Sequence, residues 1–212
     1  MDQDPQVSTL IQAVEQANSP LAMLTAVRSL AAVRHPDAIP TLIEVLGFNN
    51  PGAAVTAVEG LAALGSDAVL PLLKQLDDHN YGARAWAIRA LADIGDPRAL
   101  AVLLDAATAD FALSVRRAAA RGLGNLTWTQ LPEAEIPEAQ VHAVTALLQA
   151  THDSEWIVRY AAVAGLQMLA QKLSPAQGDR RKVIQQRLEQ LLADDPVASI
   201  QARSQLALSK LG

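Results

Sequence analysis

Arginine and aromatic residues recur at fixed positions around a repeated segment of the chain: alanine, an apolar residue, any residue, a small residue, then leucine. Guanidinium groups bind carboxylates through paired hydrogen bonds, and aromatic rings offer flat contact surfaces. At about 100° per residue of helix, positions two before or two after the alanine face away from a core that the alanine and leucine would form, and the position six before it lies where the chain enters the helix. We therefore expect one exposed face to bind a ligand through six side chains: Tyr81, Arg89, Arg117, Arg121, Trp156 and Tyr160.

A second set of charged residues keeps a constant interval. Three times an aspartate precedes an arginine by six residues, and a fourth aspartate precedes a glutamine by the same interval. The pairs are Asp78 with Arg84, Asp110 with Arg116, Asp153 with Arg159, and Asp195 with Gln201. Because partly buried charges are costly unless paired, we interpret them as a structural ladder that links successive repeats. The alternative is that these arginines bind a carboxylate ligand.

The repeat itself decides which elements hold these residues. Copies occur, for example, at residues 57–61, 87–91 and 119–123, and the closing leucines lie at positions 30, 61, 91, 123, 166 and 208. The spacing is therefore 31, 30, 32, 43 and 42 residues. A period in this range indicates stacked supersecondary units rather than one globular core.

Each unit is expected to contain two helices. The first shows the three-four spacing of a core-facing stripe, as in Ile39, Leu42 and Leu46. Gly65 and Gly95 follow the last apolar residue of a unit, where a left-handed helix cap favours a residue without Cβ. We predict an all-α fold, an α-solenoid of about five to six helix pairs.

Composition excludes several classes of function. A formal charge of −5 and a pI near 5.3 argue against nucleic-acid binding, which requires a basic surface. The chain has no run of about 18 apolar residues, so no membrane span is predicted. The N-terminus lacks the positive charge of a signal peptide, and the chain has no cysteine, so we expect a cytoplasmic protein. Without a catalytic triad, a phosphate loop or clustered metal ligands, the residues alone favour a non-catalytic scaffold.

Three stretches carry a more specific likeness. Residues 114–124, SVRRAAARGLG, resemble HEAT-type repeats of the short subclass found in phycobilisome lyases. Residues 79–89, HNYGARAWAIR, and 154–162, SEWIVRYAA, together with the length and the lack of cysteine, resemble the smaller F-type subunits of heterodimeric E/F phycocyanobilin lyases. The likeness is strongest across residues 37–169. The first full unit departs from it, because Ala54 stands where the ladder has arginine.

This resemblance implies an activity and partners. Lyases of this type attach phycocyanobilin to a cysteine of the phycocyanin α subunit, whose thiolate adds to the ethylidene group of ring A and forms a thioether. The resemblance implies a heterodimer with a longer E-type subunit, phycocyanobilin as bound substrate, no further cofactor, and work in the cytoplasm near phycobilisomes. Catalysis would then be positioning. By position rather than by family motif, we expect Arg89, Arg117 and Arg121 to bind propionates, Tyr160 and Trp156 to contact the rings, and Asp153 to be the catalytic carboxylate.

The sequence leaves alternatives open. A related activity would detach a bilin or isomerise it during attachment, and a scaffold would bind a protein partner without any pigment. We expect one HEAT-like domain, residues 1–212. It divides into an N-terminal cap at 1–36, regular repeats at 37–169 with an insertion near 127–140, and a C-terminal capping unit at 170–212. The insertion carries Trp128 and three glutamates, which form either a spacer or an acidic flap that meets a partner.

Overall fold

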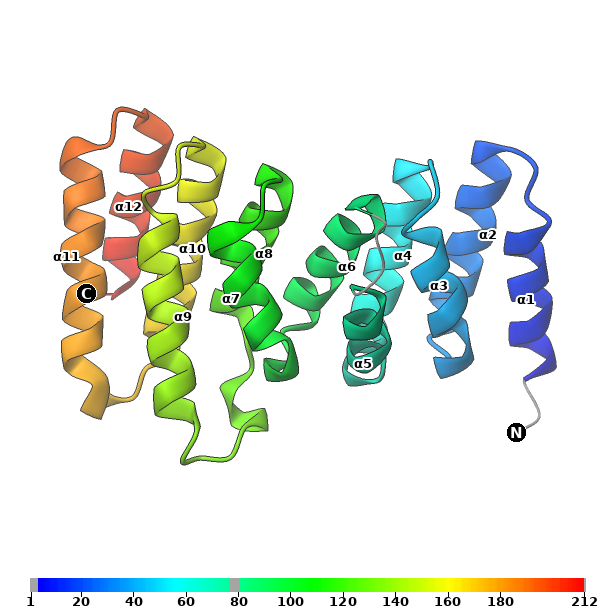
Figure 1. Cartoon of the computed structure of the whole chain (residues 1–212), viewed down its shortest axis with the longest axis horizontal. Coiled ribbons are helices and arrows are strands. Elements are labelled where there is room, and N and C mark those ends of the chain that lie inside the picture. Colours follow the sequence, from blue (N-terminus) through cyan, green and yellow to red (C-terminus); the bar gives the residue numbers. More distant parts are fainter. Residues whose placement is uncertain (1–3, 77–80, 212) are drawn as a thin grey trace. The chain divides into compact units, whose positions relative to one another are not determined.

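Helices and short 3-10 turns make up the computed structural model, which describes residues 4–76 and 81–211, without the side chain of Tyr81 (Figure 1). No strand occurs within these residues. They divide into two compact units, Met1–Asp96 and Pro97–Gly212. The predicted all-α fold of HEAT-like helix pairs is confirmed, whereas the single domain over residues 1–212 stays a prediction.

Residues 4–76 and 81–96 of the first unit form three helix pairs. Its second helices, α2, α4 and α6, pack in one layer, and α3 packs on α5. Side-chain caps stabilise the starts of α2 and α4, because Ser19 and Asn50 accept hydrogen bonds from backbone N–H groups of the first turn. The elements are α1 (Pro5–Glu15), α2 (Pro20–Ala32), η1 (Pro36–Ala38), α3 (Ile39–Val45), α4 (Pro51–Leu64), α5 (Ser66–Gln75) and α6 (Tyr81–Ile94).

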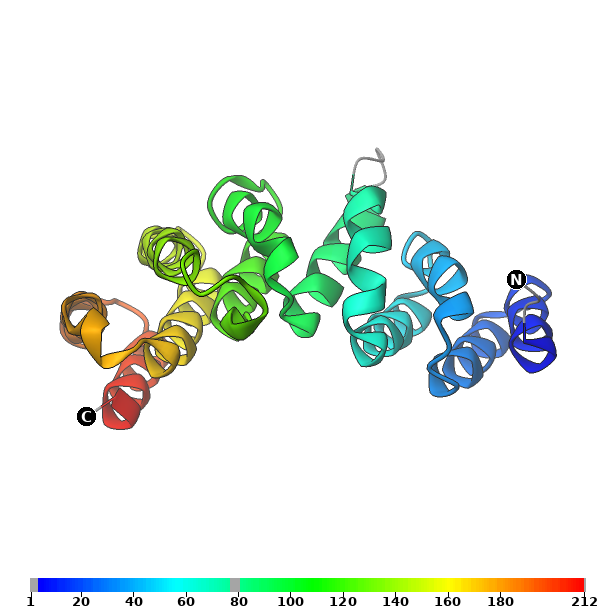
Figure 2. The ribbon, with the colours of Figure 1, turned by 90° about the horizontal axis from the view of Figure 1, so that it is seen from below.

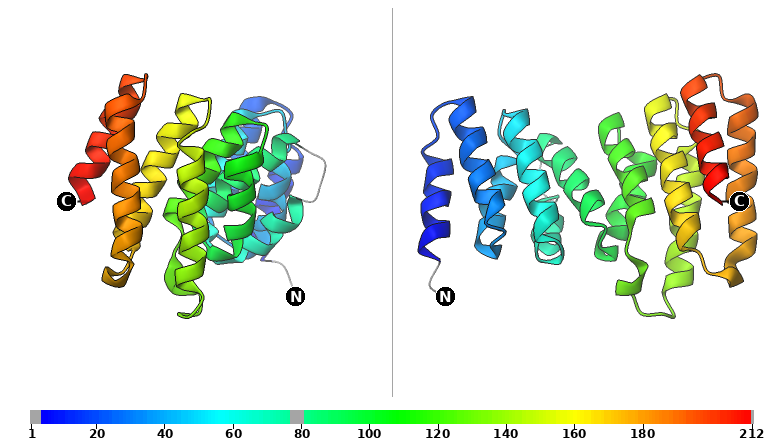
Figure 3. Two further views of the ribbon diagram at one scale, coloured as in Figure 1. Left: turned by 60° about the vertical axis from the view of Figure 1, so that its left-hand side comes forward. Right: turned by 180° about the vertical axis from the view of Figure 1, so that it is seen from behind.

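The second unit also contains three helix pairs. Figure 2 shows α9 and α11 on one side and α10 and α12 on the other, and the reverse view in Figure 3 shows α8, α10 and α12 side by side. The elements are η2 (Pro97–Ala99), α7 (Leu100–Ala109), α8 (Leu113–Asn125), η3 (Trp128–Gln130), α9 (Ile136–Ala150), α10 (Trp156–Lys172), η4 (Pro175–Gln177), α11 (Gly178–Asp194) and α12 (Ala198–Leu211).

The repeat segment forms the core, as its pattern predicts. In α8 the alanine and leucine of the segment, Ala119 and Leu123, are both 0 % exposed, and the same holds for Ala162 and Leu166 in α10. Burying a leucine side chain contributes about 1.5–3 kcal/mol relative to leaving it in water. Alanine adds little area but lets neighbouring backbones approach, so the segment buries its stripe by close packing of helices.

Helices α8 and α10 of the second unit approach each other closely at two glycines. A Cβ built on Gly124 would lie 2.6 Å from Cα of Gly165, and one on Gly165 would lie 2.5 Å from the carbonyl oxygen of Ala120. These distances are too short for any real Cβ, so only glycine fits at both positions. The small residue of the repeat segment therefore sets how near the two helices come.

Two glycine caps behave as predicted. Gly65 has φ 66° and Gly95 has φ 71°, a region that residues with a Cβ rarely adopt. The N–H of Gly65 donates to the carbonyl groups of Leu61 and Ala62, which closes the end of α4.

The insertion near residues 127–140 is anchored rather than loose. Trp128 is 5 % exposed and belongs to η3, while Glu133, Glu135 and Glu138 stay exposed. Lys172 Nζ donates to the carbonyl oxygens of Gly124 and Leu126 just before the insertion. Trp128 thus packs into the fold.

Within the described part of the chain, no helix combines the length and apolar character that a membrane crossing would need.

Candidate functional site

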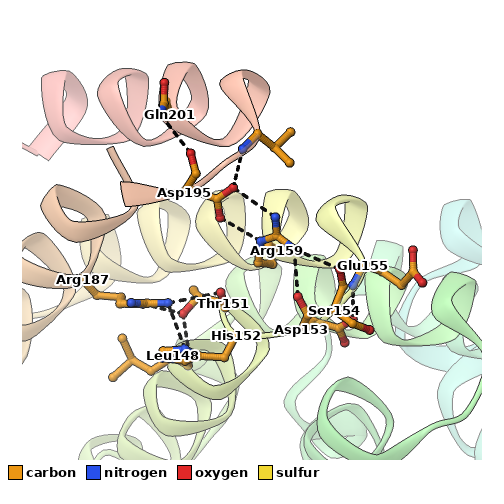
Figure 4. Close-up of polar contacts among 11 residues, drawn as sticks. Leu148, Thr151, His152, Asp153, Ser154, Glu155, Arg159, Arg187, Asp195 and Gln201 are labelled. Carbon is orange, nitrogen blue, oxygen red and sulfur yellow. Dashed lines mark hydrogen bonds and ion pairs between the residues drawn. The ribbon is translucent and has the colours of Figure 1, made fainter. Parts of the chain in front are cut away.

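The ladder between the last repeats is a set of two-pronged ion pairs, of which Figure 4 shows the one between Arg159 and Asp195. Arg116 in α8 donates from Nε to Oδ2 of Asp153 at 2.6 Å and from Nη2 to Oδ1 at 3.1 Å. Its Nη1 donates to the backbone carbonyl groups of Asp110 and Phe111. The arginine therefore ties the loop six residues earlier to the carboxylate of the next repeat.

The next rung repeats this geometry. Arg159 in α10 donates from Nε and Nη2 to the two carboxylate oxygens of Asp195, at 2.8 and 3.0 Å, and from Nη1 to the carbonyl groups of Asp153 and Ser154. Gln201, the last residue of the series, keeps only the backbone contact, to the carbonyl of Asp195 at 2.9 Å. A ladder linking successive repeats is confirmed at Asp153 and Asp195, whereas Asp78 lies outside the described residues.

Burial and pairing set the charge states of these groups. In Asp195 the hydrogen bond from Arg159 lowers the pKa of the carboxyl below its usual range, despite burial. In Asp153 burial acts to raise the pKa, but the hydrogen bonds from Arg116 and from the N–H of Glu155 outweigh it, so that pKa is also lowered. The hydrogen bond to Asp153 raises the pKa of Arg116. Both aspartates are therefore carboxylates at neutral pH.

This arrangement bears on the expected catalytic role of Asp153. Its side chain is 11 % exposed, and both oxygens accept hydrogen bonds from Arg116. Oδ1 also accepts from the N–H of Glu155 at 2.9 Å. To donate or take a proton, Asp153 would have to release Arg116, so its contacts favour the structural role, and its catalytic role stays a prediction.

An open pocket of about 510 Å³ lies at the end of the ladder. Arg187 from α11 reaches into it and donates to Oγ1 and the carbonyl of Thr151, with His152 Nδ1 at 3.2 Å from its Nη2. Burial lowers the pKa of Arg187, and the nearby Asp195 partly offsets this. The lining residues are Thr151, His152, Asp153, Arg159, Arg187, Gln190, Leu191, Asp194, Asp195 and Pro196.

Four of the six expected ligand-binding residues lie on two packed helices of the second unit. Arg117 and Arg121 are exposed on α8, and Trp156 and Tyr160 are 46 % and 40 % exposed on α10. Arg117 and Tyr160 hold equivalent positions in consecutive repeats, and neighbouring helices lie about 8–10 Å apart. This second-helix face, formed by these four residues, carries groups that suit a flat ligand with carboxylates.

The other two expected residues belong to the first unit. Arg89 in α6 has a side chain 40 % exposed, its Nε lies 4.0 Å from Oδ2 of Asp93, and its guanidinium lies 5.6 Å from the ring centroid of Trp86. The side chain of Tyr81 lies outside the described residues. Ligand binding by Arg89 and Tyr81 stays a prediction.

Sequence reasoning missed one contact on the second-helix face. Arg203 in α12 lies with its guanidinium 6.0 Å from the ring centroid of Tyr160. It sits one residue before the position of the repeat alanine, which is Ser204 in this loose copy. The only available signal was an arginine in a column that elsewhere holds small or apolar residues, such as Ala118 and Ala161.

No group of three or more His, Asp or Glu side chains that could hold a metal ion occurs among residues 4–76 and 81–211.

Comparison with known proteins assigns the family. Residues 7–81, 56–124 and 70–167 match HEAT repeats. The chain is 49 % identical over 208 residues to the phycocyanin alpha phycocyanobilin lyase CpcF of Synechocystis sp. strain PCC 6803, covering 98 % of this chain and 95 % of the relative. It belongs to the phycocyanobilin lyase family of HEAT-repeat proteins.

Other members of the phycocyanobilin lyase family are similar to this chain over most of its length. The phycocyanobilin lyase subunit beta of Pseudanabaena tenuis is 54 % identical over 206 residues, which are 97 % of this chain and 73 % of the relative. The solved complex of CpcE and CpcF of phycocyanin lyase from Nostoc sp. PCC7120 contains a chain that matches with 51 % identity and a TM-score of 0.75. That match covers 82 % of this chain and 99 % of the solved one.

Proposed function

We propose that this chain is the smaller subunit of a heterodimeric lyase that attaches phycocyanobilin to a cysteine of the phycocyanin α subunit. The observation that carries the proposal is 49 % identity, over nearly the whole length of both chains, to a phycocyanin alpha phycocyanobilin lyase. The match to a chain of the CpcE and CpcF complex supports a longer, E-type subunit as the partner. The proposed place of action is the cytoplasm, as the acidic, cysteine-free sequence led us to expect.

The reaction adds a thiol across a double bond. The acceptor's sulfur forms a bond to the ethylidene carbon of ring A, the π electrons of that bond move into the tetrapyrrole, and the tetrapyrrole takes up a proton. Nothing leaves, so the lyase need only hold the two reactants in a reactive orientation. The absence of cysteine here fits this division of labour, because the nucleophile belongs to the acceptor.

The second-helix face supplies groups for holding the pigment. Arg117 and Arg121 bind propionates through charge-assisted hydrogen bonds, and Tyr160 and Trp156 contact the conjugated rings. Ligand binding by Arg89 and Tyr81, which belong to the first unit, remains a separate part of the proposal. We keep Asp153 as the proposed catalytic carboxylate, which would protonate or orient the tetrapyrrole after releasing Arg116.

Co-expression tests the proposal. A phycocyanin α subunit, a bilin-producing pathway and the E-type partner are expressed with and without this chain, and zinc-induced fluorescence of the α band is read after denaturing electrophoresis. We expect fluorescence only when this chain is present. Equal fluorescence in both cultures would mean that attachment does not require it. A bilin-detaching or scaffold role would then be examined with pre-loaded α subunit and by partner capture.

Two variants and a control test whether the activity depends on the second-helix face. Arg117→Ala and Arg121→Ala remove exposed side chains of α8, and we expect a fall of about tenfold or more in pigment attached, with the protein still folded. Arg28→Ala, an exposed arginine of α2 in the first repeat, is the control and should leave attachment unchanged. Equal effects of all three changes would point to general charge rather than to the face.

A further inference from the structure

Arg203 differs from three other partly buried arginines of the second unit. Arg116, Arg159 and Arg187 each donate several hydrogen bonds to acceptors within the chain. Arg203 is half-buried and, within residues 4–76 and 81–211, has neither a hydrogen-bond acceptor nor an ion-pair partner. Burial lowers the pKa of its guanidinium, which the nearby Tyr160 partly offsets. A desolvated charge without a counter-ion is costly, so its retention points to an anion supplied from outside.

The free donors of Arg203 have the geometry of a carboxylate receptor. Its Nη1 is enclosed without an acceptor, whereas Nε and Nη2 are not enclosed and also have none. Nε and Nη2 are the two atoms with which Arg116 and Arg159 bind Asp153 and Asp195 side-on. In Arg203, therefore, the two donors with which the ladder arginines bind carboxylates have no acceptor within the described residues.

Tyr160 completes the site. Its ring lies beside the Arg203 guanidinium at 6.0 Å, close enough for a cation–π contact, and is 40 % exposed. Trp156 lies one turn before Tyr160 on α10 and is 46 % exposed. On the other side, Arg117 occupies the position of Tyr160 in the preceding repeat and also lacks an acceptor within the described residues. Two guanidiniums thus flank an aromatic surface on three neighbouring helices.

We propose that Arg203, held against Tyr160, binds one propionate of the bilin while the ring system lies against Tyr160 and Trp156. The proposal rests on the proposed function, because it assumes that a bilin is the ligand of this face. The site favours a bilin over a carboxylate of a partner protein, since exposed aromatic rings adjoin the donors of Arg203. The arginine is a binding and positioning residue, and the reacting carbon lies on the ligand.

The test uses the complex of this chain with its E-type partner and titrates phycocyanobilin by absorption. Arg203→Gln should weaken binding about tenfold to a hundredfold, and Arg203→Lys, which keeps the charge but not the planar fork, should recover part of it. Lys210→Gln, on the same helix and exposed, removes the same charge and should bind within about twofold of the parent. The thermal midpoint of Arg203→Gln should not fall, because the variant removes an unpaired charge.

Comparing phycocyanobilin with its dimethyl ester, which has no carboxylate, tests whether Arg203 binds a carboxylate of the pigment. The parent complex should bind the ester more weakly than the free acid, and Arg203→Gln should show a smaller difference, because only the second propionate then still has a guanidinium partner; such a reduction is the signature of a direct contact in a double-mutant cycle. Equal weakening of both ligands, or unchanged binding of the free acid by Arg203→Gln, would overturn the proposal. If the variant loses the partner subunit but not the bilin, the carboxylate belongs to the partner and the proposal is also wrong. If the parent itself does not bind bilin, the proposed function fails first.

Discussion

Asp195 and its neighbour Asp194 provide a comparison at the scale of single residues. Asp195 is 4 % exposed in its side chain and holds Arg159 with both oxygens, whereas Asp194 is exposed. Removing one partner of a buried ion pair costs about 3–5 kcal/mol, because the other charge stays buried. We expect Asp195→Asn to lower the free energy of unfolding by about this amount at pH 7, and Asp194→Asn to change it by less than about 0.5 kcal/mol. Urea unfolding measures both.

The ion pair between Arg159 and Asp195 also predicts that the free energy of unfolding depends on pH. Since pairing lowers the pKa of Asp195 below its unfolded value of about 3.9, its contribution is present above that pH and is lost as the pH falls through the folded pKa. The difference in unfolding free energy between the parent and Asp195→Asn should therefore be constant at pH 5–7 and shrink below about pH 4. A difference that stays constant down to pH 2 would show that the aspartate is not stabilised as a carboxylate.

At the scale of helices, the small residue of the repeat controls how α8 packs on α10. Gly165→Ala would place a Cβ 2.5 Å from the carbonyl oxygen of Ala120, and a backbone atom cannot turn aside. We expect a net loss of about 1–3 kcal/mol, although alanine is the better helix former by about 1 kcal/mol. Gly178→Ala in α11 is the control: nothing lies within 4 Å of its added Cβ, so it should be neutral or stabilising. Denaturant unfolding of the two variants gives the comparison.

At the scale of the whole molecule, the proposed heterodimer makes stability depend on the partner. A partner that binds only the folded chain stabilises it by about 2.7 kcal/mol at a hundredfold excess over its dissociation constant. We expect the thermal midpoint of this chain to rise as the E-type subunit is added, and the two to elute together on size exclusion. An unchanged midpoint with separate elution would contradict the heterodimer. Calorimetric scans at several partner concentrations provide the measurement.

Repetition explains why so much of the fold could be predicted. Alanine and leucine recur in a helical register, so the buried face of α8 and α10, the glycine caps at Gly65 and Gly95, and the interval of the ladder all follow from local rules. The same register placed Arg117, Trp156 and Tyr160 on the exposed side. Periodicity also explains the misses, because it describes an average repeat and says little about a residue that departs from it.

The sequence by itself determined the helix pairs, their core and the exposed face, because these depend on residue spacing along one helix. Tertiary structure decided which partner each charged group has. Asp153 and Asp195 pair with arginines about 37 residues away in sequence, and Arg203 comes to lie on Tyr160 with its donors unpaired. Such contacts depend on where neighbouring repeats stack, to within a fraction of a hydrogen-bond length, and spacing along a single helix does not contain that distance.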